Sequence, residues 1–284
     1  MNILVFPHLG LGDQFVMNGY VQFLLKEKKV HEVCIIAKQY QQKTLEHLYS
    51  DFTNVSFYWI RETNERSGSS WEQNDLFLKS INHTPFNTQV FYKGKTFYLH
   101  NFGCHTTQPF HIHFTNWADA FYYQAGVDPS IRLNFTFPSN LENAKKLYQC
   151  VIDSIGTDKY ILVHDDPLRK RHINQTLFKD ITNANGNGTV AVLYLGRDRY
   201  NEPLFENTNN QGSNELLQCD SLLDYTYLIK NALECHFMDS SIGVITDFIK
   251  DSTTKLYNHQ YITNEGQGYA SSQRINILRN WTYL

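Results

Sequence analysis

The chain has 284 residues, with 25 lysines and arginines against 28 aspartates and glutamates, so its formal net charge is −3. This near-neutral balance excludes a strongly basic nucleic-acid-binding protein, and the aromatic fraction of 14% excludes a disordered chain. The five cysteines are widely spaced, and no run of about 18 apolar residues occurs. We therefore expect a cytoplasmic protein of about two domains, without a transmembrane segment.

The first 60 residues alternate between short apolar runs and helical periodicity. The elements expected in chain order are a strand at 3–6, a glycine-containing turn at 7–13, a helix at 14–28, a strand at 33–37, a helix at 39–48 and a strand at 55–59. This order predicts a parallel sheet with helices on its faces.

Further elements expected in the first half are a polar loop at 61–74, a strand at 96–100, a helix at 116–126 and a connection between domains at 127–140. The same alternation of strands and helices returns in the second half. Those expected in the second half are strands at 160–164, 190–195, 235–238 and 259–262, helices at 141–154, 174–182, 222–232 and 242–250, a polar loop at 199–213 and a helical segment at 269–284. The fold class predicted is α/β, with two Rossmann-like domains at 1–138 and 139–284, a cleft between them, and a last helix that packs back on the first domain.

A glycine-rich corner joins the first strand to the first helix. Gly10 and Gly12 permit a ligand to approach the backbone closely, and a helix N-terminus favours an anion or a sugar hydroxyl. His8 and Asp13 flank these glycines at the carboxyl end of the strand, where open α/β sheets bind ligands. Asp13 is a candidate general base or, alternatively, the N-terminal cap of the helix, and the glycines alternatively form a tight turn without a ligand.

A second candidate segment follows the first strand of the second half. His164 ends this strand, and Arg169, Lys170 and Arg171 follow it. Three cations at a strand end suit a diphosphate because they neutralise it through charge-assisted hydrogen bonds, and the alternative is a solvated charged loop. The neighbouring pair Asp165-Asp166 favours no dedicated metal site, because adjacent side chains diverge on a strand.

A third candidate segment lies between the strand at 235–238 and the helix at 242–250. Asp239, Ser240 and Ser241 occupy this strand-to-helix turn. Their side chains suit a helix cap, and the turn also offers hydroxyl and N–H donors to a phosphate.

One stretch of the first half is rich in soft metal ligands. It contains His100, Cys104, His105, His111 and His113. Their spacing matches no standard zinc site, so we expect these residues to line the cleft or to lie in strands of the first domain, and we expect no metal.

The glycine corner, the cationic segment and the serine turn together resemble glycosyltransferases of the GT-B type. The run from Gly10 to Gln14 resembles the Gly-Leu-Gly-Asn-Gln opening of fucosyltransferases, with Asp13 in place of asparagine, and is similar to the Gly-Asp of heptosyltransferases. His164 with Arg169 and Arg171 resembles the His-x-Arg-Arg segment that holds the donor diphosphate in fucosyltransferases, with Asp165-Asp166-Pro167 interrupting the motif.

Two further segments extend the resemblance. The turn at 239–241 is similar to the Ser-Ser-Phe-Ser or Asp-Thr-Gly turn found late in these families, and 117–127 looks like the helix that closes their first domain. The resemblance implies an inverting, metal-independent transfer of a sugar from a nucleotide-diphosphate donor to a glycan or other hydroxyl acceptor, without a cofactor and with a GDP-sugar favoured. It also implies that the first domain binds the acceptor and the second the donor.

These observations assign roles to individual residues. The candidate catalytic residues are Asp13 and His8. Either is a candidate for the base that accepts the proton of the acceptor hydroxyl. The candidate donor-binding residues are Gly10, Gly12, His164, Arg169, Lys170, Arg171, Asp239, Ser240 and Ser241. We expect the cationic segment and the serine turn to meet at one diphosphate pocket.

Two other functions stay open. The interruption at Asp165-Asp166-Pro167 favours a non-catalytic binding protein that keeps the same fold. A nicotinamide-dependent oxidoreductase is disfavoured because Phe15 stands where the third glycine of the dinucleotide fingerprint belongs, and because Ala37-Lys38 supplies no acid for the ribose.

Overall fold

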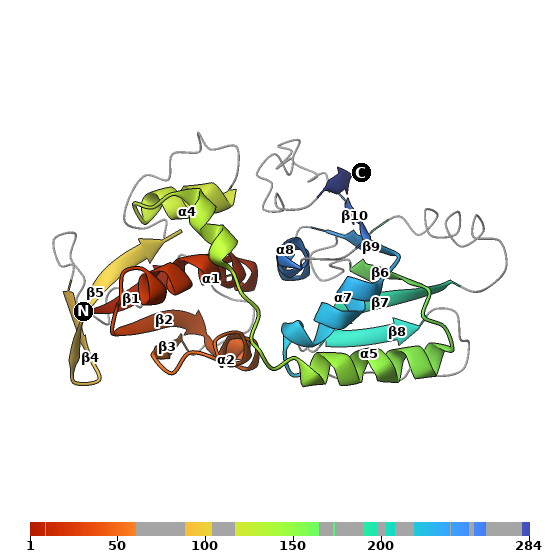
Figure 1. Ribbon diagram of the computed structural model, residues 1–284, viewed down its shortest axis with the longest axis horizontal. Helices are drawn as coiled ribbons and strands as arrows, with labels where there is room; N and C mark the ends of the chain where they lie inside the picture. The colour runs from red at the N-terminus through yellow and green to blue at the C-terminus, as the bar shows by residue number, and fades with distance from the viewer. Residues whose placement is uncertain are drawn as a thin grey trace. The chain divides into compact units, whose positions relative to one another are not determined.

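The computed structural model describes residues 1–8, 10–60, 89–103, 117–164, 173, 190–197, 203–207, 219–238, 240–249, 253–259 and 280–284. The chain divides into two compact units (Figure 1). The described residues of the first unit fall within 1–139, and those of the second fall within 140–284. Within the described residues, no helix combines the length and the apolar character needed to cross a bilayer.

The first unit is built on a five-stranded sheet with the order β3-β2-β1-β5-β4. Its elements are β1 (Asn2–Pro7), α1 (Leu11–Lys26), β2 (Glu32–Lys38), the 3-10 helix η1 (Gln39–Gln41), α2 (Gln42–Leu48), β3 (Val55–Ile60), β4 (Gln89–Tyr92), β5 (Lys95–Phe102), α4 (Trp117–Gln124) and the 3-10 helix η2 (Pro129–Asn134). All strand pairs are parallel except β4 with β5. The chain adds β2 and β3 on one side of β1 and then returns to place β5 and β4 on the other side. The strand order therefore reverses between β1 and β5.

Apolar runs account for the central strands. Every residue of 3–7 in β1 and of 33–37 in β2 is buried, which is typical of parallel strands covered on both faces. Figure 1 shows α1 lying along this sheet. The predicted strands and helices of the first 60 residues are confirmed to within a few residues, and the polar loop predicted at 61–74 lies outside the described residues.

Strand β4 was not predicted from the sequence. It pairs with β5 through a tight hairpin in which Lys93 and Gly94 both have positive φ, 46° and 75°. Two consecutive positive φ values match the twist of a hairpin, and the glycine supports the second of them without strain. The short sequence Tyr92-Lys93-Gly94-Lys95 was the available signal for this turn.

Helix α1 packs very closely on η2. A Cβ atom added to Gly19 would lie 2.6 Å from the carbonyl oxygen of Ile131 and 2.7 Å from the Cα atom of Arg132. The glycine therefore allows the backbones of α1 and η2 to touch. The predicted connection at 127–140 thus contains a 3-10 helix that belongs to the first unit.

A buried polar stripe on α1 holds the segment that follows η2. The side-chain oxygen of Asn18 accepts hydrogen bonds from the Thr136 backbone N–H at 3.2 Å and from Nε2 of Gln22 at 3.0 Å. Gln22 Nε2 also contacts the Thr136 hydroxyl. These contacts satisfy polar groups that would otherwise lose their solvation inside the unit.

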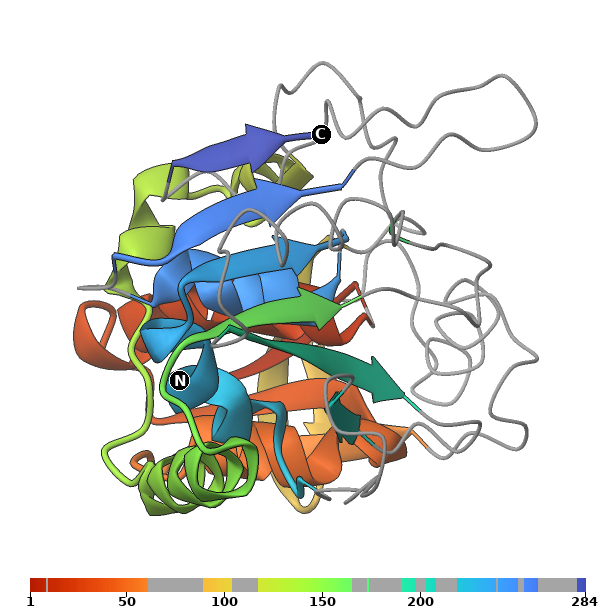
Figure 2. The same cartoon turned by 90° about the vertical axis from the view of Figure 1, so that its right-hand side faces the viewer.

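The second unit is built on a six-stranded sheet with the order β11-β10-β9-β6-β7-β8. Its elements are α5 (Glu142–Ile155), β6 (Tyr160–His164), β7 (Ala191–Arg197), β8 (Pro203–Asn207), the 3-10 helix η4 (Leu222–Tyr225), α7 (Thr226–Asn231), β9 (Glu234–Phe237), α8 (Ser241–Phe248), β10 (Lys255–Asn258) and β11 (Trp281–Tyr283). All pairs are parallel except β7 with β8, and Figure 2 shows the parallel strands ending at one edge of the sheet. In this sheet the strand order reverses between β6 and β9.

Several predictions for the second half were wrong in detail. Strand β8 occupies part of the predicted polar loop at 199–213, where it pairs with β7 as an antiparallel edge strand. Strand β10 covers 255–258, and of the strand expected at 259–262 only residue 259 is described, which lies outside any strand. Of the helical segment expected at 269–284 only residues 280–284 are described, and β11 is a strand there. The helix predicted at 222–232 is divided into η4 and α7. The helix predicted at 174–182 lies outside the described residues.

Candidate functional site

The first candidate site lies where β1 ends and α1 begins. Gly10 is the N-terminal cap of α1, and Asp13 is the third residue of the helix, so the alternative that Asp13 caps the helix was wrong. A Cβ atom at Gly10 would lie 2.4 Å from Oδ2 of Asp13, so the glycine makes room for this carboxylate. Gly12 lies in the first turn of α1, whose leading N–H groups have no partners within the helix.

The structure brings His8 and Asp13 together. Nδ1 of His8 lies 2.5 Å from Oδ2 of Asp13, and both side chains are largely buried. A carboxylate only accepts hydrogen bonds, so Nδ1 carries the proton and Nε2 is the remaining ring nitrogen. Burial of the imidazole lowers the pKa of His8, but the charge and the hydrogen bond of Asp13 outweigh it and hold that pKa above the ordinary value of 6.5.

The neighbouring strands place two further groups beside His8. The backbone N–H of His8 donates to the carbonyl of Phe102 at 2.9 Å, which continues the pairing of β1 with β5. On the other side, the register Val5↔Ile35 brings His8 level with Lys38 when it is continued by three residues. The positive charge of Lys38 works against Asp13, because it lowers the pKa of His8.

Gly103 and Phe121 support the histidine and were not predicted from the sequence. The ring of His8 stacks on that of Phe121 with a centroid distance of 6.1 Å. Gly103 follows β5 with φ of 79°, and a Cβ atom there would lie 2.7 Å from the Phe121 ring. Gln124 Oε1 accepts the N–H of Gly103 at 2.6 Å. The glycine directly after Phe102 was the available signal, but the sequence does not show that it meets Phe121.

This corner coincides with the reversal of strand order in the first sheet. β1 has β2 on one side and β5 on the other, and the chain leaves β1 toward β2. Open α/β sheets bind ligands outside the carboxyl ends of the strands at such a reversal. The His8–Asp13 pair is therefore placed where this architecture binds ligands.

The second candidate site lies at the corresponding edge of the second sheet. His164 ends β6 level with Phe237, the last residue of β9. The hydroxyl of Ser240 accepts the N–H of Gly243 at 3.4 Å, so Ser240 caps α8, and Ser241 is the first residue of this helix. The segments that follow β6 and β9 therefore start side by side at the reversal of the second sheet.

His164 is held by the sheet around it. Its Nδ1 lies 2.5 Å from the carbonyl oxygen of Leu195 on β7, and its ring meets Phe237 edge to face at 6.5 Å. Because the carbonyl only accepts, Nδ1 carries the proton. Four other predicted donor-binding residues, Arg169, Lys170, Arg171 and Asp239, lie outside the described residues.

The histidine-rich stretch of the first half is described only at His100. This residue lies on β5, and its Nδ1 is 2.7 Å from the hydroxyl of Tyr20 on α1. Burial lowers the pKa of His100. Among the residues that the structure describes, no group of three histidines, cysteines or carboxylates is arranged to hold a metal ion.

Comparisons with known proteins concern the fold. No family profile and no curated protein matches the sequence. The structure is similar to a glycosyl transferase family 9 protein of Veillonella parvula DSM 2008, with 12% identity and a TM-score of 0.59 over 100% of this chain and 85% of that one. It is also similar to E. coli heptosyltransferase WaaC with ADP, with 9% identity and a TM-score of 0.50 over 93% of this chain and 88% of that one. The predicted α/β class, with two largely parallel sheets like those of GT-B glycosyltransferases, is thereby confirmed.

Proposed function

We propose that the protein is a glycosyltransferase that moves a sugar from a nucleotide-diphosphate donor to a hydroxyl acceptor. The observation that carries the proposal is the buried His8–Asp13 pair at the strand-order reversal of the first sheet. A hydroxyl becomes a useful nucleophile when a positioned base accepts its proton, and this pair provides such a base. The fold likeness to two glycosyltransferases supports the same class of reaction.

In this proposal the first unit binds the acceptor and removes its proton. The carboxylate of Asp13 or Nε2 of His8 accepts the proton as the acceptor oxygen attacks the anomeric carbon. The bond between that carbon and the diphosphate breaks on the opposite side, so the product has inverted configuration. The reaction needs neither a metal ion nor a cofactor in this proposal.

The second unit binds the donor in this proposal. The leaving diphosphate gains negative charge as its bond to the sugar breaks, and donors that face this charge lower the barrier. Ser240 and Ser241 start α8 beside the end of β6, and Arg169, Lys170 and Arg171 follow β6 in the sequence. His164 and Asp239 complete the proposed set, and Gly10 and Gly12 allow the substrate to approach the first unit. Of the donor nucleotides, guanine is favoured, and adenine is the second candidate because WaaC is described with ADP.

A thermal-shift screen tests the proposal. We expect GDP, ADP or their sugar derivatives to raise the melting temperature without magnesium, and the nucleotide sugar to be hydrolysed slowly or transferred. The double variant Arg169→Ala, Arg171→Ala abolishes the shift, whereas Asp13→Asn keeps the shift and loses turnover. Lys145→Ala is the matched control, because it removes an exposed cation of the same unit that pairs with Glu142 on α5. Absence of any shift and of any hydrolysis contradicts the proposal.

The alternative is a binding protein of the same fold that does not catalyse transfer. The interruption of the cationic motif at Asp165-Asp166-Pro167 favours it. A thermal shift with nucleotide sugars that is accompanied by neither hydrolysis nor transfer to any acceptor supports this alternative over the enzyme. We expect the protein to act in the cytoplasm in either case.

A further inference from the structure

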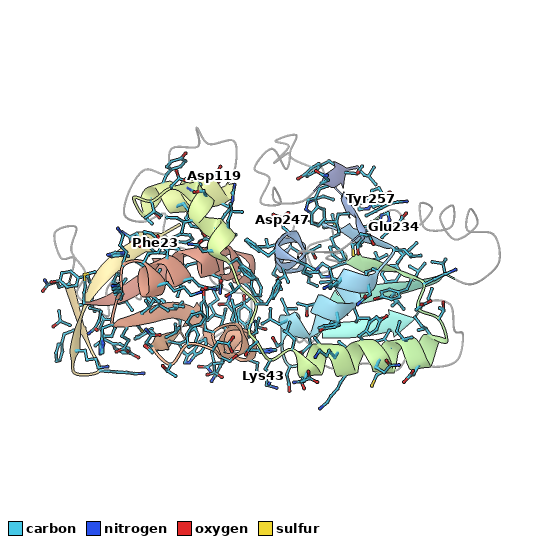
Figure 3. All side chains as sticks on the ribbon, in the orientation of Figure 1. Phe23, Lys43, Asp119, Glu234, Asp247 and Tyr257 are labelled. Atoms are coloured by element: carbon cyan, nitrogen blue, oxygen red, sulfur yellow. The ribbon has the colours of Figure 1, made fainter. Side chains whose placement is uncertain are left out.

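A chain of three polar side chains crosses two strands of the second unit and takes no part in the proposed function. Nε2 of His236 on β9 lies 3.4 Å from Oε2 of Glu234, and Nδ1 of His236 lies 3.0 Å from Nε2 of His259, which follows β10. Glu234 also accepts from Nζ of Lys255 at 3.2 Å. Figure 3 labels Glu234 and, on the next strand, Tyr257, whose ring stacks on that of His236 at 4.5 Å.

The hydrogen bonds among Glu234, His236 and His259 determine which ring nitrogens carry protons. A carboxylate only accepts, so Nε2 of His236 donates to Glu234, and Nδ1 of the neutral His236 ring is then an acceptor. His259 must therefore donate through its Nε2. The remaining nitrogen of His259, Nδ1, is left as a hydrogen-bond acceptor.

The surroundings keep both rings neutral. His236 is 1% exposed, and its burial lowers its pKa although Glu234 opposes the change. Burial, together with the neighbouring His236, lowers the pKa of His259 to about 4. Among the described residues, the groups that face the pair include Tyr257 on β10, Val163 on β6 and the ion pair of Glu234 with Lys255. Both rings therefore stay neutral around pH 7, and one hydrogen bond links them.

His259 lies at the edge of the sheet where we propose that the donor binds. Its backbone N–H donates to the carbonyl of Phe237 at 2.8 Å, so it is level with the start of the turn that leads to Ser240. Its side chain is only partly buried, in contrast to His236. The backbone of His259 is therefore level with the start of the turn that follows β9, and its ring, held by His236, offers Nδ1 as a hydrogen-bond acceptor.

We propose that His259 is a donor-recognition residue whose Nδ1 accepts a hydrogen bond from an O–H or N–H group of the nucleotide sugar, and that Glu234 and His236 are positioning residues that set its tautomer. This inference rests on the proposed function, because it assigns a further contact to the same donor site. The group that donates belongs either to the nucleoside or to the sugar, and the experiment distinguishes the two.

Calorimetric titration of wild type and His259→Phe tests the contact, because phenylalanine keeps a ring and removes both nitrogens. We expect the variant to bind the nucleotide sugar about tenfold more weakly, as loss of one buried hydrogen bond implies. Equal weakening for the free nucleoside diphosphate assigns the group to the nucleoside, and weakening confined to the nucleotide sugar assigns it to the sugar. His31→Gln, which changes an exposed histidine of the first unit, is the control and binds normally.

Nitrogen NMR of the histidine rings tests the tautomers without any ligand. We expect the Nε2–H form for both His236 and His259, and Glu234→Gln weakens the preference at both rings. An Nδ1–H form of His259, or unchanged affinity of a folded His259→Phe variant for a nucleotide sugar that wild type binds, overturns the inference and leaves the proposed function standing. Failure of wild type to bind any nucleotide removes both.

Discussion

At the scale of single residues, opposing effects determine the pKa of His8 in the His8–Asp13 pair. Burial disfavours a charged imidazole, and the nearby Lys38 disfavours it further. Asp13 overcomes both because its carboxylate lies 2.5 Å from Nδ1. The net rise in the pKa of His8 means that the native state binds a proton more tightly than the unfolded chain does.

Replacement of Asp13 by asparagine should therefore destabilise the protein in a pH-dependent way. A histidine whose pKa is raised by folding contributes stability that is complete below its unfolded value of 6.5 and is lost as the pH rises through its folded value. We expect Asp13→Asn to cost about 1.5–3 kcal/mol near pH 5.5 and clearly less near pH 8.5. Urea unfolding at both pH values measures the difference. In a His8→Gln background the cost of Asp13→Asn should not vary over this range, and a pH-independent cost in the wild-type background would contradict the assignment.

The sequence indicated both members of this pair but not their contact. His8 and Asp13 stand out because they flank two glycines after an apolar strand. Whether they meet depends on the path of the backbone at Gly10, where a Cβ atom would collide with the carboxylate. Gly103 and Phe121 could not be predicted, because they reach His8 through the pairing of β5 with β1.

At the scale of elements, the central parallel strands could be predicted, whereas of the four edge strands only β3 was predicted. β1, β2 and β6 are continuous apolar runs because helices or other segments cover both of their faces. β4, β8 and β11 have three to five residues and lie at the edges of their sheets. Edge strands are short and only partly covered, so their sequences carry little periodicity.

Two glycines of the β4–β5 region should respond differently to alanine. Gly94 and Gly103 have nearly the same φ, 75° and 79°, but a Cβ atom at Gly94 meets no atom within 4 Å, whereas one at Gly103 meets the Phe121 ring. We expect Gly94→Ala to cost about 1 kcal/mol through backbone strain alone, and Gly103→Ala about 2–4 kcal/mol because the ring must also move. Urea midpoints of the two variants give the comparison. Similar costs at the two positions would show that Phe121 shifts freely.

At the scale of the whole molecule, both units follow one plan. Each sheet starts at a central strand, grows to one side and then continues on the other side of that strand. The sequence indicated this α/β plan through its rhythm of apolar runs. It could not indicate the chemistry at the second reversal in the same detail, because capping of α8 by Ser240 accounts for that serine without any ligand.

Hydrogen exchange should locate nucleotide binding within one unit. Binding stabilises the native state by about 2.7 kcal/mol when the free ligand is at a hundred times its Kd. If the proposed donor site is right, a nucleoside diphosphate slows exchange in peptides covering the end of β6 and the start of α8, and leaves β1 to β3 unchanged. Mass spectrometry of the exchanged peptides reads this out. Protection confined to residues 1–139 would show that the nucleotide binds to the first unit and would contradict the proposed donor site.

The close packing at Gly19 has a consequence for how the first site works. Because even one methyl group on α1 would strike the backbone of η2, the two elements pack without a gap at this point, which favours a single position of the helix. The first turn of the same helix carries Asp13, whose carboxylate is also held by Nδ1 of His8. A base that is preorganised in this way requires little reorganisation during proton transfer, and adaptation to different acceptors must then come from segments other than this helix.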